Sequence, residues 1–332
     1  MKRSKEAEYR KVMIISLSAI SLLILLLLLS TIGSVQLGLK EIISELIKGE
    51  NQMIQTIVLK MRLPRNILAA IVGASLAVSG LLLQAVMKNP LADPGITGVS
   101  SGATVAAVII LLVAPKYTAV LPIIAFIGGG IACFLVYMMA WKNGLQPGRI
   151  VLAGVAINTI LGGIISFFSV MYSDRIQTAL LWLNGSLATK TWQDVRMLGA
   201  YTVIGLVASL FLIRSANILQ LGDEAAINLG VNLTRTRLII SVVAVFLAAT
   251  ATAIVGIISF VGLIVPHMAR MLMGSDHKYT VPFSIVLGAI VLLLADTLAR
   301  TIGGAIEIPV GVMMAIVGGP FFLYLLRKRG NV

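Results

Sequence analysis

Side chains able to do acid–base or metal chemistry are few in this chain. The only histidines are His267 and His277, and neither has a cysteine or carboxylate at the spacing of a metal site. The single cysteine, Cys133, lies in an apolar run and has no partner for a disulfide within the chain. The sequence contains no serine–histidine–aspartate set and no pair of carboxylates suited to catalysis. We therefore predict no catalytic residue, no bound metal and no enzyme activity in the chain itself.

The sequence also lacks the features by which a transport protein uses ATP or an ion gradient. There is no G-x-x-x-x-G-K-[ST] loop to hold nucleotide phosphates. A carrier driven by a proton or sodium gradient usually has an acidic residue or a histidine inside the membrane. No charged residue lies at the centre of any apolar span described below. These absences weaken the interpretation as an ATPase or an ion-coupled carrier, and we expect the energy to come from another chain.

The elements that hold these residues must lie in a membrane. Of 332 residues, 58% are hydrophobic and 12% are charged, against about 25% charged in a soluble domain. The mean hydropathy is +1.02. Residues 12–39 carry no charge, and their apolar part is long enough to cross a bilayer as a helix. Because this segment lacks a small-residue cleavage site, we interpret it as an uncleaved first span rather than a signal peptide.

Apolar runs separated by polar or proline-containing breaks predict an all-α, polytopic integral membrane protein with about ten transmembrane helices. The predicted spans are 12–33, 66–87, 96–114, 118–140, 150–172, 193–213, 238–258, 260–273, 281–299 and 309–326. The weakest boundary is 256–262, where only glycines and Ser259 suggest a re-entrant turn. We treat 12–326 as a single transmembrane domain in the cell membrane, between basic tails at 1–11 and 327–332.

The positive charge indicates how the chain is oriented. An even number of spans places both termini on one side, and with the termini in the cytoplasm, 16 of the 26 Lys and Arg residues lie inside. This excess agrees with the positive-inside rule. The net charge of +13 is scattered among the connections rather than gathered on one face with aromatic residues, so we predict contact with the lipid bilayer and no nucleic-acid binding.

The largest inside connection, residues 214–237, predicts a short helix available to a partner. Asp223 is suited to cap this helix and Gly230 to close it. Ala226, Ile227 and Leu229 supply apolar side chains for burial against a soluble protein that docks from the cytoplasm. An amphipathic connector at the lipid interface is the alternative interpretation.

Several motifs, in order along nearly the whole chain, resemble the iron-siderophore and vitamin B12 permeases of ABC importers, the FecCD family. They are 59–65 (LKMRLPR), 89–94 (NPLADP), 98–103 (GVSSGA), 260–267 (FVGLIVPH), 309–311 (PVG) and 319–322 (GPFF). The pattern E-A-A-x-x-x-G at 224–230 resembles the loop that engages the ATPase subunit, although the Ile-x-Leu-Pro that follows it in relatives is missing. The resemblance assigns ATPase coupling to Leu221, Gly222, Asp223, Glu224, Ala225, Ala226 and Gly230.

This resemblance implies a permease subunit that imports a ferric siderophore. Its expected partners are a second permease subunit, identical or similar, two cytoplasmic ATPase subunits that bind ATP and magnesium, and an extracytoplasmic binding protein. The chain itself would hold no cofactor. Haem and cobalamin remain alternative cargoes. An ion-coupled secondary transporter and a polytopic scaffold remain alternatives from other classes.

The resemblance also suggests docking points for the binding protein. Arg62, Arg65 and Arg300 lie at the predicted outer ends of spans, where guanidinium groups can pair with carboxylates on a docked protein. The alternatives are snorkelling to lipid headgroups and, for Arg300, an ion pair with Asp296 one helical turn away.

Two further sites concern the transport route. Small and polar residues recur every four positions in the fifth span and form a stripe that the resemblance places at the dimer seam and pathway: Gly154, Asn158, Gly162 and Ser166. Packing within the subunit explains such a stripe equally well, and is the interpretation we favour for Ala69, Gly73 and Ala77 in the second span. The turn at Gln146, Pro147 and Gly148 matches the family's cytoplasmic gate, although relatives have small hydroxyl residues at the last two positions. A plain Pro-Gly turn is the alternative.

Overall fold

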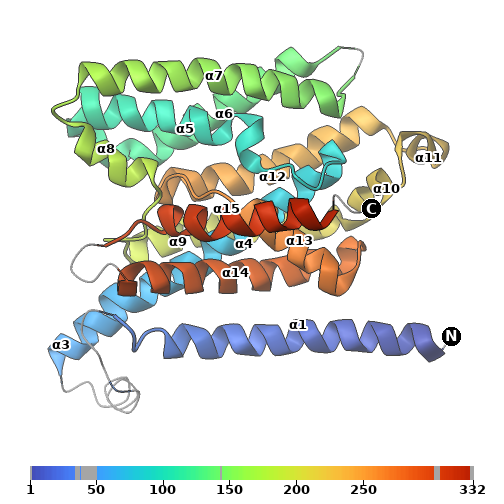
Figure 1. The fold of residues 1–332 in the computed structure, drawn as a ribbon, viewed down its shortest axis with the longest axis horizontal. Coiled ribbons are helices and arrows are strands. Elements are labelled where there is room, and N and C mark those ends of the chain that lie inside the picture. Colours follow the sequence, from blue (N-terminus) through green and yellow to red (C-terminus); the bar gives the residue numbers. More distant parts are fainter. Residues whose placement is uncertain (1, 34–37, 39–50, 143, 303–306, 330–332) are drawn as a thin grey trace.

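The computed structural model describes residues 2–33, 38, 51–142, 144–302 and 307–329. All regular structure in these ranges is helical, apart from one isolated bridge between Trp141 and Leu145. Most helices run roughly parallel or antiparallel to one another, so the molecule has two ends at which the connections gather (Figure 1). The predicted all-α class is confirmed.

The helices alternate with short connections in the order expected of a polytopic protein. The long or apolar ones are α1 (Lys2–Leu28), the continuous α3, η1 and α4 (Gln52–Gln55, Thr56–Arg62, Leu63–Met87), α5 with η3 (Val99–Val108, Ile109–Val113), η4 with α6 (Pro115–Val120, Leu121–Ala140), α7 (Pro147–Met171), α9 (Trp192–Phe211), α12 (Leu233–Val255), α13 (Val261–Met273), α14 (His277–Ile302) and α15 (Val310–Arg329). Shorter helices are η2 (Pro94–Thr97), α8 (Ile176–Leu183), α10 (Ile213–Gln220) and α11 (Asp223–Asn228).

The expected number of spans agrees with these elements. Among the described residues, seven helices are long and apolar enough to cross a membrane, and three shorter apolar helices accompany them, at Val99–Val113, Val261–Met273 and Val310–Leu323. The chain is therefore a multi-pass membrane protein. Helix α1 begins at Lys2, so residues 2–11, expected as a basic tail, belong to the same helix as the first span. Residues 40–50 of the predicted connection 40–65, and residues 330–332 of the tail 327–332, lie outside the described ranges.

Helix α4 forms the centre of the molecule. It packs against α9, α12, α13 and α14, and nearly all its side chains are buried. Small residues make this possible, because Gly73 of α4 and Gly288 of α14 meet backbone to backbone, and a Cβ on either would collide with the other residue. The stripe of Ala69, Gly73 and Ala77 is fully buried, which confirms the prediction that it serves packing.

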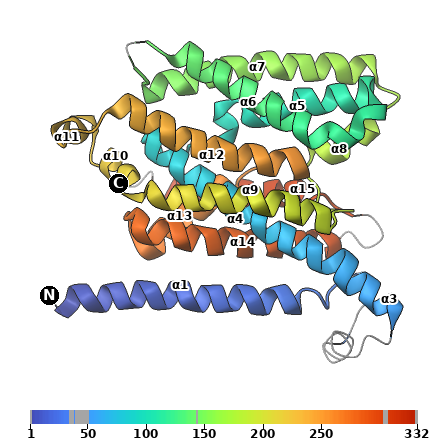
Figure 2. The ribbon, with the colours of Figure 1, turned by 180° about the vertical axis from the view of Figure 1, so that it is seen from behind.

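The remaining helices lie on two sides of this centre. Helices α5, α6, α7 and α8 form a layer above α12 in Figure 1, and α14 with α1 lies on the opposite side; the view from behind agrees (Figure 2). Helix α1 packs mainly along α14, where Lys11 lies 4.8 Å from the ring centroid of Tyr279. Most other side chains of α1 are exposed in this chain, as expected of a helix that faces lipid.

The boundary between α12 and α13 is a sharp break. Helix α12 ends at Val255, three residues before the predicted end, because Gly256 (φ +80°) leaves the helix. Phe260 (φ +69°) then precedes α13. A Cβ on Gly256 would collide with the carbonyl oxygen of Trp182, so the break also depends on close approach to the end of α8. The predicted turn at 256–262 therefore corresponds to a non-helical segment.

Candidate coupling surface and transport pathway

The loop predicted to contact a partner lies at one end of the molecule. Helix α11 projects beyond the start of α12, at the same end of the molecule as the start of α1 but on the opposite side (Figures 1 and 2). Leu221, Ile227 and Leu229 are 64%, 58% and 61% exposed, whereas Ala226 is fully buried within the chain. The loop thus presents three large apolar side chains, one in α11 and the other two directly after α10 and α11. We call these three residues the apolar loop patch.

Of the two predictions about the ends of this helix, one is wrong and one is confirmed. The N-cap residue is Gly222 (φ +109°), and Asp223 is the first helical residue without a capping hydrogen bond. The expectation that Asp223 caps the helix is therefore wrong: its carboxylate is drawn to two cations instead. Gly230 (φ +76°) closes the helix, because its N–H donates to the carbonyl of Ile227 at 2.8 Å, and the next residue donates to Ala226 at 3.0 Å.

Asp223 holds α11 to the rest of the molecule. Its Oδ1 accepts hydrogen bonds from Lys88 Nζ and from Arg237 Nη2, the latter at 2.6 Å. Arg237 is 3% exposed and also donates from Nη1 to the carbonyl of Leu145 at 2.7 Å. Partial burial opposes ionisation of Asp223, but the hydrogen bonds and charges of Lys88 and Arg237 outweigh it and lower its pKa. We call Lys88, Asp223, Arg237 and Leu145 the coupling node.

The node joins connections that are distant in sequence. Lys88 ends α4 in the left-handed conformation (φ +49°), Arg237 lies in the first turns of α12, and Leu145 belongs to the turn before α7. Sequence analysis missed Lys88 and Arg237, because each looked like an ordinary basic residue at the end of an apolar span. Any displacement of α11 therefore acts directly on α4, α12 and the turn between α6 and α7.

A second contact anchors the same loop. Asn217 of α10 donates to Asp276 Oδ1 at 2.7 Å, and its Oδ1 accepts from the backbone N–H of His277 at 2.9 Å. His277 Nδ1 lies 2.7 Å from the same oxygen. Partial burial opposes ionisation of Asp276, but the hydrogen bonds from the Lys278 backbone and Asn217 outweigh it and lower its pKa. Helix α10 is thus tied to the turn between α13 and α14.

The predicted gate turn lies next to the node. Gln146 is the N-cap residue of α7, and Pro147 occupies the first helical turn, which suits its fixed φ angle. Arg149 Nε donates to the carbonyl of Ala140 at 3.0 Å and closes the turn. A Cβ on Gly148 would meet no atom within 4 Å, so that position faces open space in this chain.

The four-residue stripe of α7 divides into two parts. Gly154 is buried, and a Cβ there would collide with the carbonyl of Ile96; Asn158 Nδ2 donates to the carbonyl of Gly95 at 3.0 Å. This half of the stripe packs on η2. Gly162 and Ser166 instead lie where α7 is open in this chain, with no atom within 4 Å of a Cβ at Gly162 and with Ser166 exposed.

The three predicted docking arginines lie together at the other end of the molecule, where α1 and α14 end and η1 begins α4 (Figure 1). Each is at most 9% exposed and has internal partners. Arg62 Nη1 donates to the carbonyls of Ser30 and Thr31 at 3.0 and 3.1 Å, and Arg300 Nη2 donates to Leu29 at 2.8 Å. These donors satisfy carbonyls left unpaired at the end of α1.

Arg65 makes the strongest of these contacts. Its Nε and Nη2 lie 2.9 and 3.0 Å from the two carboxylate oxygens of Asp296, and Nη1 lies 3.0 Å from Glu307 Oε1. Asp296 therefore pairs with Arg65, and the alternative in which Arg300 is its partner is wrong: Arg300 bonds Thr297 on its own helix instead. The docking role of the three arginines stays a prediction.

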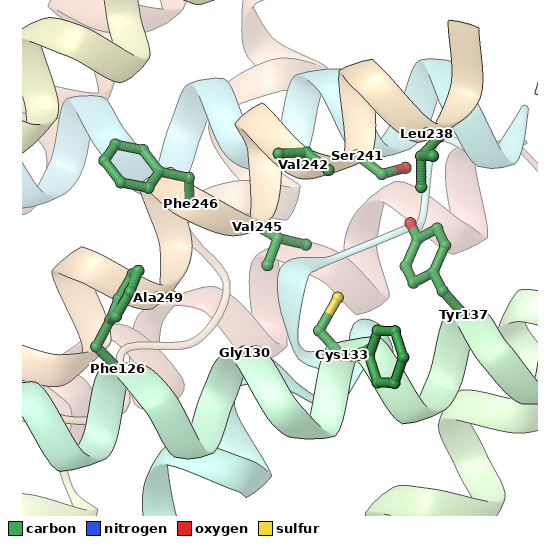
Figure 3. Close-up of a pocket in the computed structure, with 11 residues that line it drawn as sticks. Phe126, Gly130, Cys133, Tyr137, Leu238, Ser241, Val242, Val245, Phe246 and Ala249 are labelled. Atoms are coloured by element: carbon green, nitrogen blue, oxygen red, sulfur yellow. The ribbon is translucent and has the colours of Figure 1, made fainter. Parts of the chain in front are cut away.

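A separate groove lies between α6 and α12. It has a volume of about 310 Å³ and is lined by Phe126, Gly130, Cys133, Phe134, Tyr137, Leu238, Ser241, Val242, Val245, Phe246 and Ala249. Cys133 and Tyr137 point from α6 toward α12 (Figure 3). None of the lining residues is charged, so the groove suits apolar contact rather than recognition of a polar cargo. Neither histidine is near enough to other ligands to form a metal site among the described residues.

The fold and the loop at its end define the class of this protein, a polytopic membrane permease. The model of the FecCD transport family matches residues 21–328, and the chain belongs to that family. It is 38% identical to the Fe(3+)-citrate import system permease protein YfmE of Bacillus subtilis, over 98% of each chain. It is 44% identical to the cobalamin import system permease protein BtuC of Halobacterium salinarum, over 85% of this chain and 76% of that protein.

A solved structure supports the same assignment. An inward-facing metal-chelate type ABC transporter superposes with a TM-score of 0.84 at 28% identity, covering 95% of this chain and 99% of that one. The resemblance found in the sequence motifs is therefore confirmed at the level of the family and the fold.

Proposed function

We propose that this chain is the transmembrane subunit of a binding-protein-dependent ABC importer that moves a ferric siderophore across the cell membrane. ATP hydrolysis occurs in a separate subunit. The observation that carries this proposal is the apolar loop patch on α10 and α11, which is exposed yet firmly anchored by the coupling node. A freely exposed apolar patch on a cytoplasmic connection is typical of a protein interface. Membership in the FecCD transport family supports the same conclusion.

The proposed partners occupy different faces. Two cytoplasmic ATPase subunits, which bind ATP and magnesium, dock on the loops of two permease subunits. The second permease subunit, identical or similar, packs against α7, of which only Ile150 and Gly154 are buried in this chain. The extracytoplasmic binding protein docks at the opposite end, around Arg62, Arg65 and Arg300. Glu307, 53% exposed at its side chain, gives that end an accessible charge besides the buried guanidinium groups.

The transport mechanism follows from the coupling node. Closure of the ATPase subunits displaces α11, and Asp223 transmits the displacement to α4 through Lys88 and to α12 through Arg237. Arg237 also moves the turn at Leu145, which precedes the gate residues and the pathway stripe of α7. The two permease subunits then rock against each other, so that the pathway opens to one side of the membrane at a time.

The cargo is the finer part of the proposal. A ferric siderophore is favoured because one of the relatives described above imports ferric citrate and the solved structure is of the metal-chelate type. Cobalamin and haem are the alternative cargoes, and identity to the cobalamin permease is of similar size. A pathway that receives its cargo from another protein needs few specific ligands of its own. The alternative from a different class is an ion-coupled secondary transporter.

Uptake measurements test both the class and the cargo. Iron-starved cells with and without the gene are given radioactive ferric iron on a panel of siderophores, with labelled haem and cobalamin in parallel. We expect loss of uptake for one class of siderophore. Uptake should persist when an ionophore collapses the ion gradients while ATP is maintained, and should stop when ATP is depleted. Loss of uptake confined to haem or cobalamin would change the assigned cargo to that molecule. Uptake abolished by the ionophore at constant ATP would overturn the proposal of an ABC importer.

A variant of the apolar loop patch tests the docking surface separately. Ile227→Glu with Leu229→Glu should release the ATPase subunit and abolish uptake while the permease still inserts into the membrane. Asp174→Asn, at an exposed position in the connection between α7 and α8, is the matched control and should transport normally. Normal co-purification of the ATPase with the double variant would contradict the assignment of the docking surface.

A further inference from the structure

The α4–α5 connector and the break between α12 and α13 enclose a polar pocket that transport as proposed above does not use. Its volume is about 80 Å³. Four of the residues that line it carry side-chain oxygen atoms, and the other six are apolar residues or glycines. The oxygen-bearing residues are Asp93, Ser100, Thr252 and Ser259, and the others are Leu76, Pro94, Gly95, Ile257, Ile258 and Gly262. The pocket reaches the surface of the chain at Ser259, which is exposed.

Asp93 brings a negative charge to this pocket without a positive partner. One carboxylate oxygen, Oδ1, accepts a hydrogen bond from the backbone N–H of Gly95 at 2.8 Å, so Asp93 caps η2. The other oxygen accepts no hydrogen bond, and no ion pair in the described ranges includes Asp93. A carboxylate held inside a protein without a counter-charge is costly, so a site of this kind favours a bound cation or neutralisation.

The hydroxyl groups around the pocket are also available. Thr252 is only 3% exposed, yet it makes no side-chain hydrogen bond within the described chain. This is unusual for a threonine inside a helix: Thr250, on the same helix, donates to the carbonyl of Phe246 at 2.8 Å. Ser100, which is half-buried, and Ser259, which is exposed, likewise make no side-chain hydrogen bond with described residues, although only Thr252 is buried. A buried hydroxyl without a partner normally marks a bound water, ion or ligand.

This set of ligands selects a class of occupant. It contains oxygen atoms only and a single negative charge, which suits a hard cation of charge +1. Divalent hard cations are usually held by several carboxylates, and no group of three or more His, Cys, Asp or Glu residues able to hold a metal occurs in the described chain. The volume accommodates an ion with one or two waters, each of which takes about 30 Å³, and is too small for a siderophore. We propose that this pocket binds a sodium ion.

The bound ion would join two parts of the fold. Asp93 and Ser100 belong to the connection after α4 and to the start of α5, whereas Thr252 and Ser259 flank the end of α12. Sodium held between them fastens the non-helical segment 256–260 to the α4–α5 connector. The inference goes beyond the proposed transport function, because it concerns an ion that stays in the permease rather than the cargo.

Thermal unfolding of the full chain in lipid nanodiscs tests the proposal. The unfolding temperature is measured in sodium, potassium and N-methylglucamine chloride at constant ionic strength. We expect sodium alone to raise it, by about 3 °C at ten times its dissociation constant. Asp93→Asn should remove the sodium response. Thr252→Val, which keeps the shape of the side chain and deletes one oxygen, should shift the response to higher sodium concentration.

Asp174→Asn serves as the matched control, since this exposed aspartate lies on the connection between α7 and α8, and its sodium response should equal that of the wild type. Equal unfolding temperatures of the wild type in all three salts would overturn the proposal. So would a wild-type sodium response in a folded Asp93→Asn variant, because the ion would then bind elsewhere. If Asp93→Asn does not fold, an unchanged sodium response in Thr252→Val overturns it instead. Siderophore uptake is not part of this measurement, so failure here leaves the importer proposal intact.

Discussion

Buried charge gives this chain its most sensitive positions at the residue scale. The side chain of Asp296 is completely buried and that of Arg65 is 11% exposed. Their two parallel hydrogen bonds form a bidentate pair, the strongest arrangement available to a guanidinium group and a carboxylate. Removing one partner of such a pair leaves the other charge unpaired in a poorly solvated site, whereas replacing both by apolar residues costs much less.

Asp296→Leu should therefore lower the free energy of unfolding by about 3–5 kcal/mol, because Arg65 keeps its charge without its main partner. The double variant Arg65→Met with Asp296→Leu should recover most of this loss. Chemical denaturation of the purified permease in detergent measures both. If the double variant lost as much free energy of unfolding as Asp296→Leu and Arg65→Met lose separately, added together, the pair would not be energetically coupled.

The same pair restricts how the docking prediction can be tested. A reversal such as Arg65→Glu would place a carboxylate against Asp296 and Glu307, so lost uptake would report damage to the fold as well as lost docking. Glu307→Gln changes the exposed member of this group alone. If the binding protein docks at this end, this variant changes its affinity at low salt, and transporter pull-down with the binding protein measures that change.

Asp223 gives a prediction about pH. Its pKa is lowered in the folded chain by Lys88 and Arg237, in spite of partial burial. A lowered pKa contributes stability above the unfolded value of about 3.9, and this contribution is lost as pH falls through the folded value. Asp223→Asn should thus destabilise the loop by at most about 1 kcal/mol at neutral pH, since the side chain is 42% exposed.

The difference between wild type and Asp223→Asn should be constant from neutral pH to about pH 5 and should shrink below about pH 4. Hydrogen exchange of the α11 amides, followed against pH, measures it. Asp174→Asn is the control, because Asp174 is 72% exposed and pairs only with its neighbour Arg175, at 3.3 Å. A difference that grows on acidification would contradict the ion pair.

At the scale of elements, the sequence allowed the spans and turns to be predicted but not the contacts between them. Apolar runs gave the number of spans, because each must match the thickness of a bilayer. Glycine and proline located the turns at 256–262 and before Pro147. The coupling node could not be predicted, since Lys88, Asp223 and Arg237 are far apart in sequence and no periodic pattern links them. The partners of Arg62 and Arg300 depend on where α1 ends, which only the packed structure fixes.

Glycine contacts set the spacing between elements, and the crossing of α4 and α14 is the clearest case. Gly73→Ala adds a Cβ that overlaps the backbone of Gly288. We expect a loss of about 1–3 kcal/mol and reduced yield of folded protein, because two buried helices must separate. Gly130→Ala in α6 is the matched control, since its Cβ would meet no atom within 4 Å. Equal thermal stability of the two variants would contradict the close helix crossing.

At the scale of the whole molecule, the two ends differ in what they present. The start of α1, the end of α15, the gate turn and α11 gather at one end, and the arginine group with the start of α8 lies at the other (Figures 1 and 2). The excess of basic residues predicts that the first end is cytoplasmic. The proposed docking of ATPase subunits on the apolar loop patch implies the same orientation, because such subunits act from the cytoplasm.

Cysteine labelling can establish this orientation, because the single native cysteine, Cys133, is buried; it is first changed to alanine. In that background, Asp174→Cys should react with a charged, membrane-impermeant thiol reagent in intact cells. Glu8→Cys, exposed at the opposite end on α1, should react only after permeabilisation. The reversed pattern would place the apolar loop patch outside and remove the ATPase docking surface. Labelling of both positions in intact cells would contradict the placement of these segments on opposite sides of the membrane, since ten spans keep the two ends apart.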